Sequence, residues 1–182
     1  MRRLLLALMW LAAAPPAAAT TFVPVAFPQL VAASGVIVHA RVVDVRVVRT
    51  AGPPPVETLV TLDALGYLKG QLGPSVTIAV PGGEIGRYRT VFVGAPRFRV
   101  GDEVVLFLDA RGPRLPWISG LSQGVFRVVR ASDGSAPMVT PPPIEAQVHG
   151  AAGPVARGDP ARRPMALDRF DEAVRAVVEG RP

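Results

Sequence analysis

The residue types that carry most enzyme chemistry are sparse in this sequence. It contains two histidines, His39 and His149, 110 residues apart, and no cysteine. A metal site needs several His, Cys or carboxylate ligands at short spacing, which these histidines do not supply. The serines considered as nucleophiles lie at expected strand ends or turns, outside any Gly-x-Ser-x-Gly context; they are Ser34, Ser75, Ser119, Ser122 and Ser132. We therefore predict no catalytic residue, no metal site and no cofactor.

A glycine-rich stretch at residues 82–86 invites comparison with a phosphate-binding loop. Such a loop leads into a helix and usually carries Lys and Ser or Thr. Here Arg87 and Tyr88 follow, and then the extended run Val91 to Val93. We therefore interpret the stretch as a loop whose glycines adopt positive φ. The adjacent acids Asp102 and Glu103 are better explained by a turn and a strand start than by a glycosidase carboxylate pair.

Basic and aromatic residues interleave just after this loop and form the candidate binding surface. Its members are Arg87, Tyr88, Arg89, Phe92, Arg97, Phe98 and Arg99. Single-strand nucleic-acid sites combine such groups, but the N-terminal segment predicts export, so we expect no nucleic-acid partner. The alternative is that the two phenylalanines belong to the core and the arginines only solvate its rim.

The first 19 residues have the pattern of a secretory signal peptide. Met1-Arg2-Arg3 is basic, Leu4 to Ala14 is an apolar run of eleven residues, and Ala17-Ala18-Ala19 fits an A-x-A cleavage site. The run is shorter than the roughly 20 residues of a membrane-spanning helix. We expect a periplasmic or extracellular protein with no stable membrane insertion after cleavage near Ala19; an uncleaved anchor is the alternative.

Composition predicts one domain plus a tail for the remaining 163 residues. Arg2 and Arg3 lie in the signal segment, so cleavage lowers the formal net charge from +6 to +4. With no cysteine for disulfides, stability has to come from the core, for which 49% apolar residues suffice.

Alternating β-branched segments predict an all-β fold. We expect strands at residues 36–48, 57–68, 75–80 and 103–108, the first three forming a meander. Residues 117–120 and 124–130 are expected to form a final pair of strands, with residues 121–123 turning between them. In the first, the apolar set changes face near Val42-Val43, which predicts a bulge. The strand at 103–108 is apolar on both faces and therefore belongs in the centre of the sheet. We predict a small OB-like antiparallel barrel, closed or partly open, over residues 20–130.

The C-terminal part differs in composition. Residues 131–165 are rich in proline and glycine and are predicted to be a linker. Residues 166–179 are predicted to form the one C-terminal helix, since Leu167, Phe170, Val174 and Val177 make a single apolar stripe. That stripe docks on the barrel or, alternatively, binds a partner.

Four segments together resemble the netrin-like (NTR/TIMP-like) domain. They are residues 34–42, 60–70 with the terminal Lys-Gly, 76–80 and 98–108, which is similar to the family's Phe-x-x-Gly-Glu strand. The resemblance covers roughly residues 28–110 and implies an OB-fold barrel. The loops Pro-Gly-Gly at 81–83 and Gly-Ala-Pro-x-Phe at 94–98 are also similar to uncharacterised exported bacterial proteins. Metalloprotease inhibitors of this family place a disulfide-bonded N-terminal Cys on zinc, and this chain has no Cys.

We therefore expect an exported, non-enzymatic binding or interaction module whose partner is another exported protein, for example a peptidase. A peptidase inhibitor or companion protein is the first alternative. A hydrolase with an unrecognised site is the second, and it would require a deep pocket that holds His39 beside a carboxylate such as Asp44 or Asp63.

Overall fold

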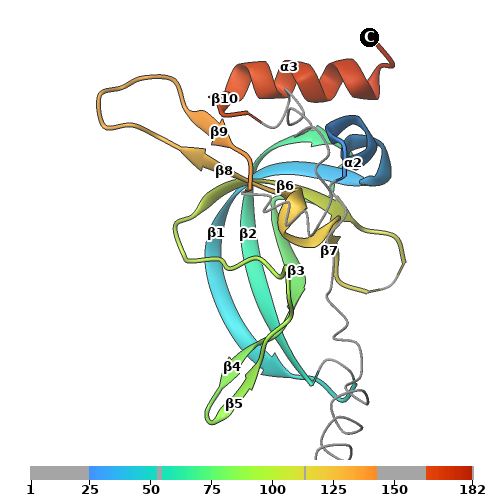
Figure 1. Cartoon of the computed structure of the whole chain (residues 1–182), viewed down its shortest axis with the longest axis vertical. Coiled ribbons are helices and arrows are strands. Elements are labelled where there is room, and N and C mark those ends of the chain that lie inside the picture. Colours follow the sequence, from blue (N-terminus) through green and yellow to red (C-terminus); the bar gives the residue numbers. More distant parts are fainter. Residues whose placement is uncertain (1–24, 53–54, 113, 143–162, 182) are drawn as a thin grey trace, which may run out of the picture.

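A curled antiparallel sheet forms the body of the protein in the computed structural model, which describes residues 25–52, 55–112, 114–142 and 163–181 (Figure 1). Its strands are β1 (Val36–Arg49), β2 (Val56–Lys69), β3 (Ser75–Pro81), β6 (Glu103–Asp109), β7 (Trp117–Ile118), β8 (Val125–Val129), β9 (Met138–Thr140) and β10 (Met165–Ala166). Hydrogen-bonded neighbours run in the order β10-β9-β8-β6-β1-β2-β3, and β7 pairs with β6. The predicted signal peptide and His149 lie outside the described residues.

The central position predicted for the strand at 103–108 is confirmed. β6 lies between β1 and β8. Val104, Leu106 and Leu108 belong to the core on one face of the sheet, while Val105 and Phe107 belong to the core on the other. All five side chains are fully buried. An edge strand would leave part of these apolar side chains in water, so a strand that is apolar on both faces is most stable at the centre of a sheet. The sequence pattern could therefore predict the position of β6.

The predicted meander of β1, β2 and β3 is also confirmed, as is the bulge in β1. Pairing between β1 and β2 shifts register between Val42 and Asp44. The extra residue turns the apolar side chains that follow, Val45 and Val47, back toward the concave face of the sheet. Both side chains then line a groove near the end of β1.

The closed form of the predicted barrel is not present. β3 and β6 are not paired, and the short β7 lies between them; the backbone N–H of Ala79 in β3 donates to the carbonyl of Pro116, 3.2 Å away, just before β7. β7 has only two residues, Trp117 and Ile118, so it is too short to provide a full ladder. The result is a strongly curled antiparallel sheet rather than a cylinder without edges.

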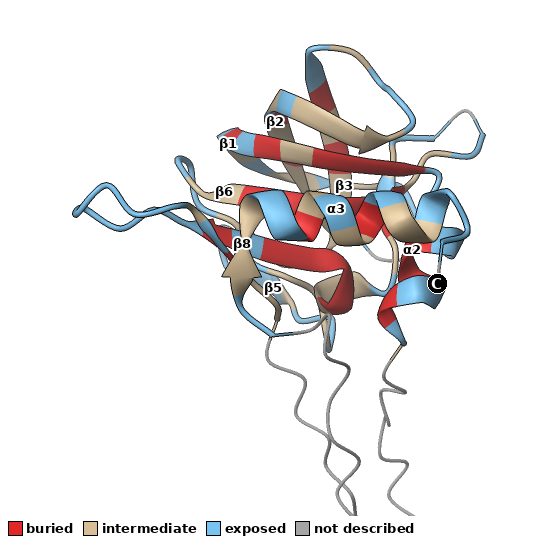
Figure 2. Ribbon diagram, turned by 90° about the horizontal axis from the view of Figure 1, so that it is seen from above, coloured by how far each residue is buried: buried red, intermediate tan, exposed pale blue. Residues whose placement is uncertain are grey.

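Two helices cover one face of this sheet: α2 (Phe27–Ala33) and α3 (Leu167–Val178). Figure 2 shows them over the same strands, with long buried segments of β1 and β8 beneath. Phe170 of α3 is fully buried and its ring lies 5.0 Å from that of Phe126 and 5.5 Å from that of Phe27. The predicted helix therefore docks on the body of the protein, and its stripe is not left free for a partner.

The sheet continues into the segment 131–165, which the sequence predicts to be a linker; residues 143–162 of that segment lie outside the described residues. β9 pairs with β8, and Val139 is buried beneath α3 and α2 in the aromatic core. β10 then pairs with β9 and leads directly into α3. The segment 117–130 also differs from expectation, because β7 and β8 each pair with β6 and not with each other.

None of the helices in the described part of the chain has the length and apolar character needed to cross a bilayer.

Candidate functional site

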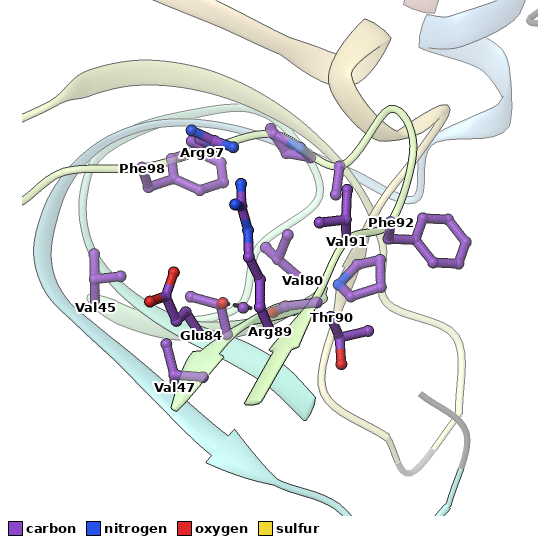
Figure 3. A pocket seen from close by; sticks show the side chains of 16 residues that line it. Val45, Val47, Val80, Glu84, Arg89, Thr90, Val91, Phe92, Arg97 and Phe98 are labelled. Carbon is purple, nitrogen blue, oxygen red and sulfur yellow. Dashed lines mark hydrogen bonds between the residues drawn. The ribbon is translucent and has the colours of Figure 1, made fainter. Parts of the chain in front are cut away.

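A groove of about 370 Å³ is lined by residues of β1, β3 and the hairpin at residues 83–90. Figure 1 shows this hairpin at the end of the curled sheet away from α3. On one side the groove is bounded by β1 and β3. On the other it is bounded by the hairpin of β4 (Gly83–Ile85) and β5 (Tyr88–Thr90) and by the loop 91–98 (Figure 3). Its volume lies in the range of ligand-binding clefts.

The floor of the groove is apolar. It is made by Val45 and Val47 of β1, Val80 of β3 and Phe98 of the loop. Val80 is buried, and Val45 and Phe98 are partly buried against the core on the concave face. The bulge at Val42-Val43 produces this floor, since without it the side chains of Val45 and Val47 would point to the opposite face.

Two glycines hold the hairpin close to the sheet. Gly82 and Gly83 have φ of 89° and 149°, so the predicted positive φ is confirmed. The prediction of a loop is wrong for residues 83–85, because they form strand β4. A Cβ on Gly83 would lie 2.8 Å from both Val47 Cγ1 and Thr58 Oγ1. The Thr58 hydroxyl donates to the carbonyl of Gly82 at 2.7 Å, and Gly82 N–H donates to the carbonyl of Val56 at 3.0 Å. The base of the hairpin is therefore fixed by close packing and by hydrogen bonds.

Three charged side chains stand around the opening of the groove. Glu84 comes from β4, Arg89 from β5 and Arg97 from the loop, and all three are exposed. Figure 3 shows the side chain of Arg89 extending from its strand toward Arg97, which lies beside Phe98 at the edge of the groove. Within the described residues, the guanidinium groups of Arg89 and Arg97 take part in no ion pair and no hydrogen bond. Their donors are available to an anion.

The seven residues of the predicted surface divide into three groups. Arg89, Phe92, Arg97 and Phe98 line the groove together. Arg87 and Tyr88 form the tip of the hairpin, where the Arg49 guanidinium carbon lies 4.7 Å from the centre of the Tyr88 ring and that of Arg87 lies 5.4 Å from it.

Arg99 belongs to neither group. Its backbone N–H donates to Asp102 at 2.9 Å, at the turn that precedes β6, and its side chain is exposed outside the groove.

The two phenylalanines have different surroundings. Phe98 is partly buried against the core, as the structural alternative predicted, whereas Phe92 is 47% exposed on the lip of the groove. Beside it Val91 and Val93 are 67% and 60% exposed. Sequence reasoning missed Val45, Val47 and Glu84 as lining residues. The change of face in β1 signalled that Val45 and Val47 turn, but not what they turn toward.

A separate polar cluster surrounds Glu103 at the start of β6. Glu103 is 8% exposed, and its two carboxylate oxygens accept hydrogen bonds from Arg130 at 2.6 and 2.9 Å. His39 Nε2 lies 2.8 Å from Glu103 Oε1. Hydrogen bonding by Arg130, and then by His39, lowers the pKa of Glu103 to about 2 against the opposing effect of burial.

His39, which the hydrolase alternative requires in a deep pocket, belongs to the cluster around Glu103. Its carboxylate neighbour is Glu103 and not Asp44, which pairs with Arg46, or Asp63, which is exposed on β2. His39 lines neither of the two grooves described here. Because Arg130 already occupies both oxygens of Glu103, the pair has the geometry of a structural ion network.

A second, more open groove of about 650 Å³ adjoins that network. Its charged groups are already paired: Arg127 lies 2.7 Å from Asp102, and Arg130 lies 2.6 Å from Glu103. The first groove is therefore the better binding candidate, because its two arginines make no ion pair within the described residues and outnumber its one carboxylate, Glu84, which lies opposite Arg89 in the β4–β5 ladder. Among the described residues, no three His, Cys, Asp or Glu side chains gather as a metal site would require.

Comparison of the chain with protein-family models, curated proteins and solved structures gives no match. The function proposed below therefore rests on the geometry of the groove.

Proposed function

We propose that this chain is an exported, non-enzymatic binding module and that the groove between β3, the β4–β5 hairpin and the loop 91–98 is its recognition site. The observation that carries the proposal is the combination of an apolar floor with two arginines, Arg89 and Arg97, whose guanidinium groups are unpaired in the described structure. Few convergent polar groups over an apolar surface are typical of binding sites. The proposed partner is another exported protein.

The exposed lip of the groove supports a protein partner. Val91, Phe92 and Val93 are all about half exposed or more. Three consecutive apolar residues on a surface are unfavourable in water unless something covers them. Aromatic and arginine side chains are also the types most enriched at the centres of protein interfaces.

The scaffold proposed for this module is a partly open OB-like barrel of the netrin-like type. The order β3-β2-β1-β6, with β7 bonded to β6 and approaching β3 through Pro116, supports that proposal. In such a scaffold the groove occupies one open end of the barrel, where a partner can enter.

Photo-crosslinking tests the proposed site. A photoreactive phenylalanine analogue replaces Phe92 in one sample of the mature chain and Val178 of α3 in the other. Both positions are 47% exposed, and α3 lies at the opposite end of the molecule (Figure 1). In a cell-envelope and secreted-protein extract, the proposal expects one dominant adduct from position 92 that is absent from position 178. Equal adducts from both positions, or none, would contradict it.

A peptidase inhibitor or companion protein is the second candidate, favoured by the hairpin tip. The hairpin projects from the body in Figure 1 and is held at its base by Thr58 and along its side by Arg49. An exposed, restrained segment of this kind suits insertion into a peptidase cleft. Tyr88→Ala combined with Arg87→Ala would then weaken inhibition about tenfold or more in a panel of peptidases of each catalytic class. Absence of inhibition by the unaltered chain would exclude this candidate.

A further inference from the structure

We infer that the occupant of the groove is an extended segment of a partner protein that carries carboxylate and apolar side chains and lies along the outer edge of β5. This inference rests on the proposed function and names the chemistry that the same site would recognise. Three independent features of the groove lead to it: its charge, its shape and its free strand edge.

The charged residues around the groove predict that its occupant carries a negative charge. Arg89 and Arg97 bring two guanidinium groups to one opening, against the single carboxylate of Glu84. Several other arginines of the described residues pair with a carboxylate, as Arg111 does with Asp109 at 2.7 Å and Arg127 with Asp102 at 2.7 Å. Arg99 and Arg114 have no such pair within the described residues either, but they lie apart and outside the groove, whereas Arg89 and Arg97 stand together at its opening. An arginine binds a carboxylate through two parallel hydrogen bonds, so the opening favours an acidic group.

Shape favours a chain over a small molecule. The apolar surface does not end at the rim of the groove, because Val91 and Phe92 line it and are 67% and 47% exposed. A free amphiphile would occupy the floor and leave this lip in water. A protein segment that continues past the groove covers both, which makes it the better match to the exposed apolar surface.

The edge of β5 supplies main-chain hydrogen bonds. β4 and β5 form a two-stranded sheet of their own. On one side β4 approaches β1 and β2, with Gly83 close against Val47 and Thr58. On the other side, β5 has no neighbouring strand within the described residues. Along an antiparallel ladder alternate residues turn their N–H and C=O groups away from the partner strand, so part of the backbone of residues 88–90 faces outward from β4. An extended segment placed there can bond to these outward groups and so gain both affinity and direction, as in β-strand addition.

Labelled synthetic peptides test the occupant directly. The first probe is a peptide of about nine residues, rich in glutamate and valine, long enough to extend beyond the hairpin. The second replaces each glutamate by lysine, and a medium-chain fatty acid serves as the small-molecule probe. Binding to the mature chain is measured by fluorescence anisotropy, and amide hydrogen exchange reports protection of β5.

The inference expects the acidic peptide to bind and to protect the outward-facing amides of β5, while the lysine peptide does not bind. Arg89→Ala combined with Arg97→Ala should weaken the acidic peptide about tenfold or more. The matched control combines Arg99→Ala with Arg114→Ala, which removes two exposed positive charges outside the groove and should change the affinity less than about twofold.

Three outcomes would overturn the inference. The first is equal binding of both peptides. The second is acidic-peptide binding that the groove variant and the control variant weaken equally. The third is groove-dependent binding of the fatty acid with no peptide binding, which would assign the groove to a small anionic amphiphile. If any of these results is obtained while position 92 still gives a specific crosslinked adduct, the proposal of a binding module is retained. Only the inference about the chemistry of its occupant is then refuted.

Discussion

At the scale of single residues, the candidate site depends on positions that sequence reasoning could identify only in part. Arg89 and Arg97 were found because basic and aromatic residues alternate around the glycine-rich loop. Arg87 and Arg99 show the same alternation but point elsewhere, since the turn of the hairpin carries one to its tip and the turn before β6 carries the other to Asp102. Spacing along the chain does not encode these directions.

Gly83 is the residue whose substitution most directly disturbs the groove. Gly83→Ala places a Cβ 2.8 Å from Val47 and Thr58 in addition to straining a positive φ. We expect a loss of about 2–4 kcal/mol in the free energy of unfolding, or displacement of the hairpin. Urea denaturation of the variant and of the unaltered chain measures this loss.

Gly86→Ala is the matched control for this substitution. Gly86 lies in the same hairpin with φ of 59°, and a Cβ added to it would have no neighbouring atom within 4 Å. Its substitution should cost only the backbone strain, about 1 kcal/mol. Equal losses for the two variants would show that the hairpin does not lie tightly on β1 and β2.

Glu103 gives a pH-dependent contribution to stability. Its pKa is about 2 in the folded chain, below the ordinary value of 4.5, because Arg130 and His39 bond its carboxylate. The unfolded chain therefore binds a proton first as the pH falls, so the stabilisation is complete above about pH 5 and is lost progressively toward pH 2. Glu103→Gln should lower the free energy of unfolding by about 1–2 kcal/mol at pH 7, discounted because Arg130 is half exposed.

Denaturant titrations of both proteins at pH 7, 5, 4 and 3 measure this contribution. The difference between them should shrink as the pH falls. A difference that stays constant across this range would mean that the Arg130 and His39 contacts do not depend on the carboxylate charge.

At the scale of elements, the features that could be predicted from the sequence were those encoded by apolar patterns on long segments. The change of face in β1 predicted the bulge that Val42 and Asp44 show, and the two apolar faces of β6 predicted its central place. β9 escaped prediction because three residues, Met138 to Thr140, stand among prolines and only Val139 is buried. β7 and β8 were paired wrongly since their sequence proximity suggested a hairpin, whereas both complete β6.

The docking of α3 can be tested at Phe170. Its ring is fully buried among Phe27, Phe107 and Phe126. Phe170→Ala should lower the free energy of unfolding by about 3–5 kcal/mol, as expected for loss of a buried aromatic ring. Val178→Ala on the exposed side of the same helix should change it by less than about 0.5 kcal/mol. Thermal denaturation measures both effects. Similar small losses for the two variants would contradict the docking of α3 and favour the alternative that its apolar stripe binds a partner.

At the scale of the whole molecule, the sheet divides the chain into a stabilising end and a binding end. Four phenylalanines and both helices fill one face. Figure 1 shows the β4–β5 hairpin at the other end of the curled sheet, and the groove and the exposed run of residues 91–93 adjoin this hairpin. The sequence alone could assign the class of fold, but closure of the barrel could not be inferred, because it depends on whether the two residues of β7 reach β3.

This separation predicts that binding and stability respond to different substitutions. Arg89→Ala combined with Arg97→Ala removes exposed side chains without ion pairs in the described structure and should change the free energy of unfolding by less than about 0.5 kcal/mol. Phe170→Ala, by contrast, should weaken stability while leaving the groove in place below its lowered melting temperature. A large stability loss in the arginine variant would show that these side chains serve the fold.

The central claim, that the groove is the recognition site, is tested most directly by an affinity measurement on the partner that is crosslinked through position 92. Its affinity is measured for three proteins: the unaltered chain, the Arg89→Ala/Arg97→Ala variant and the Arg99→Ala/Arg114→Ala control. If the groove is the recognition site, the first variant binds about tenfold or more weakly, with a smaller dependence on salt, while the control stays within about twofold of the unaltered chain. Equal affinity for all three proteins would contradict the account, because the unpaired arginines of the groove would then have no part in recognition.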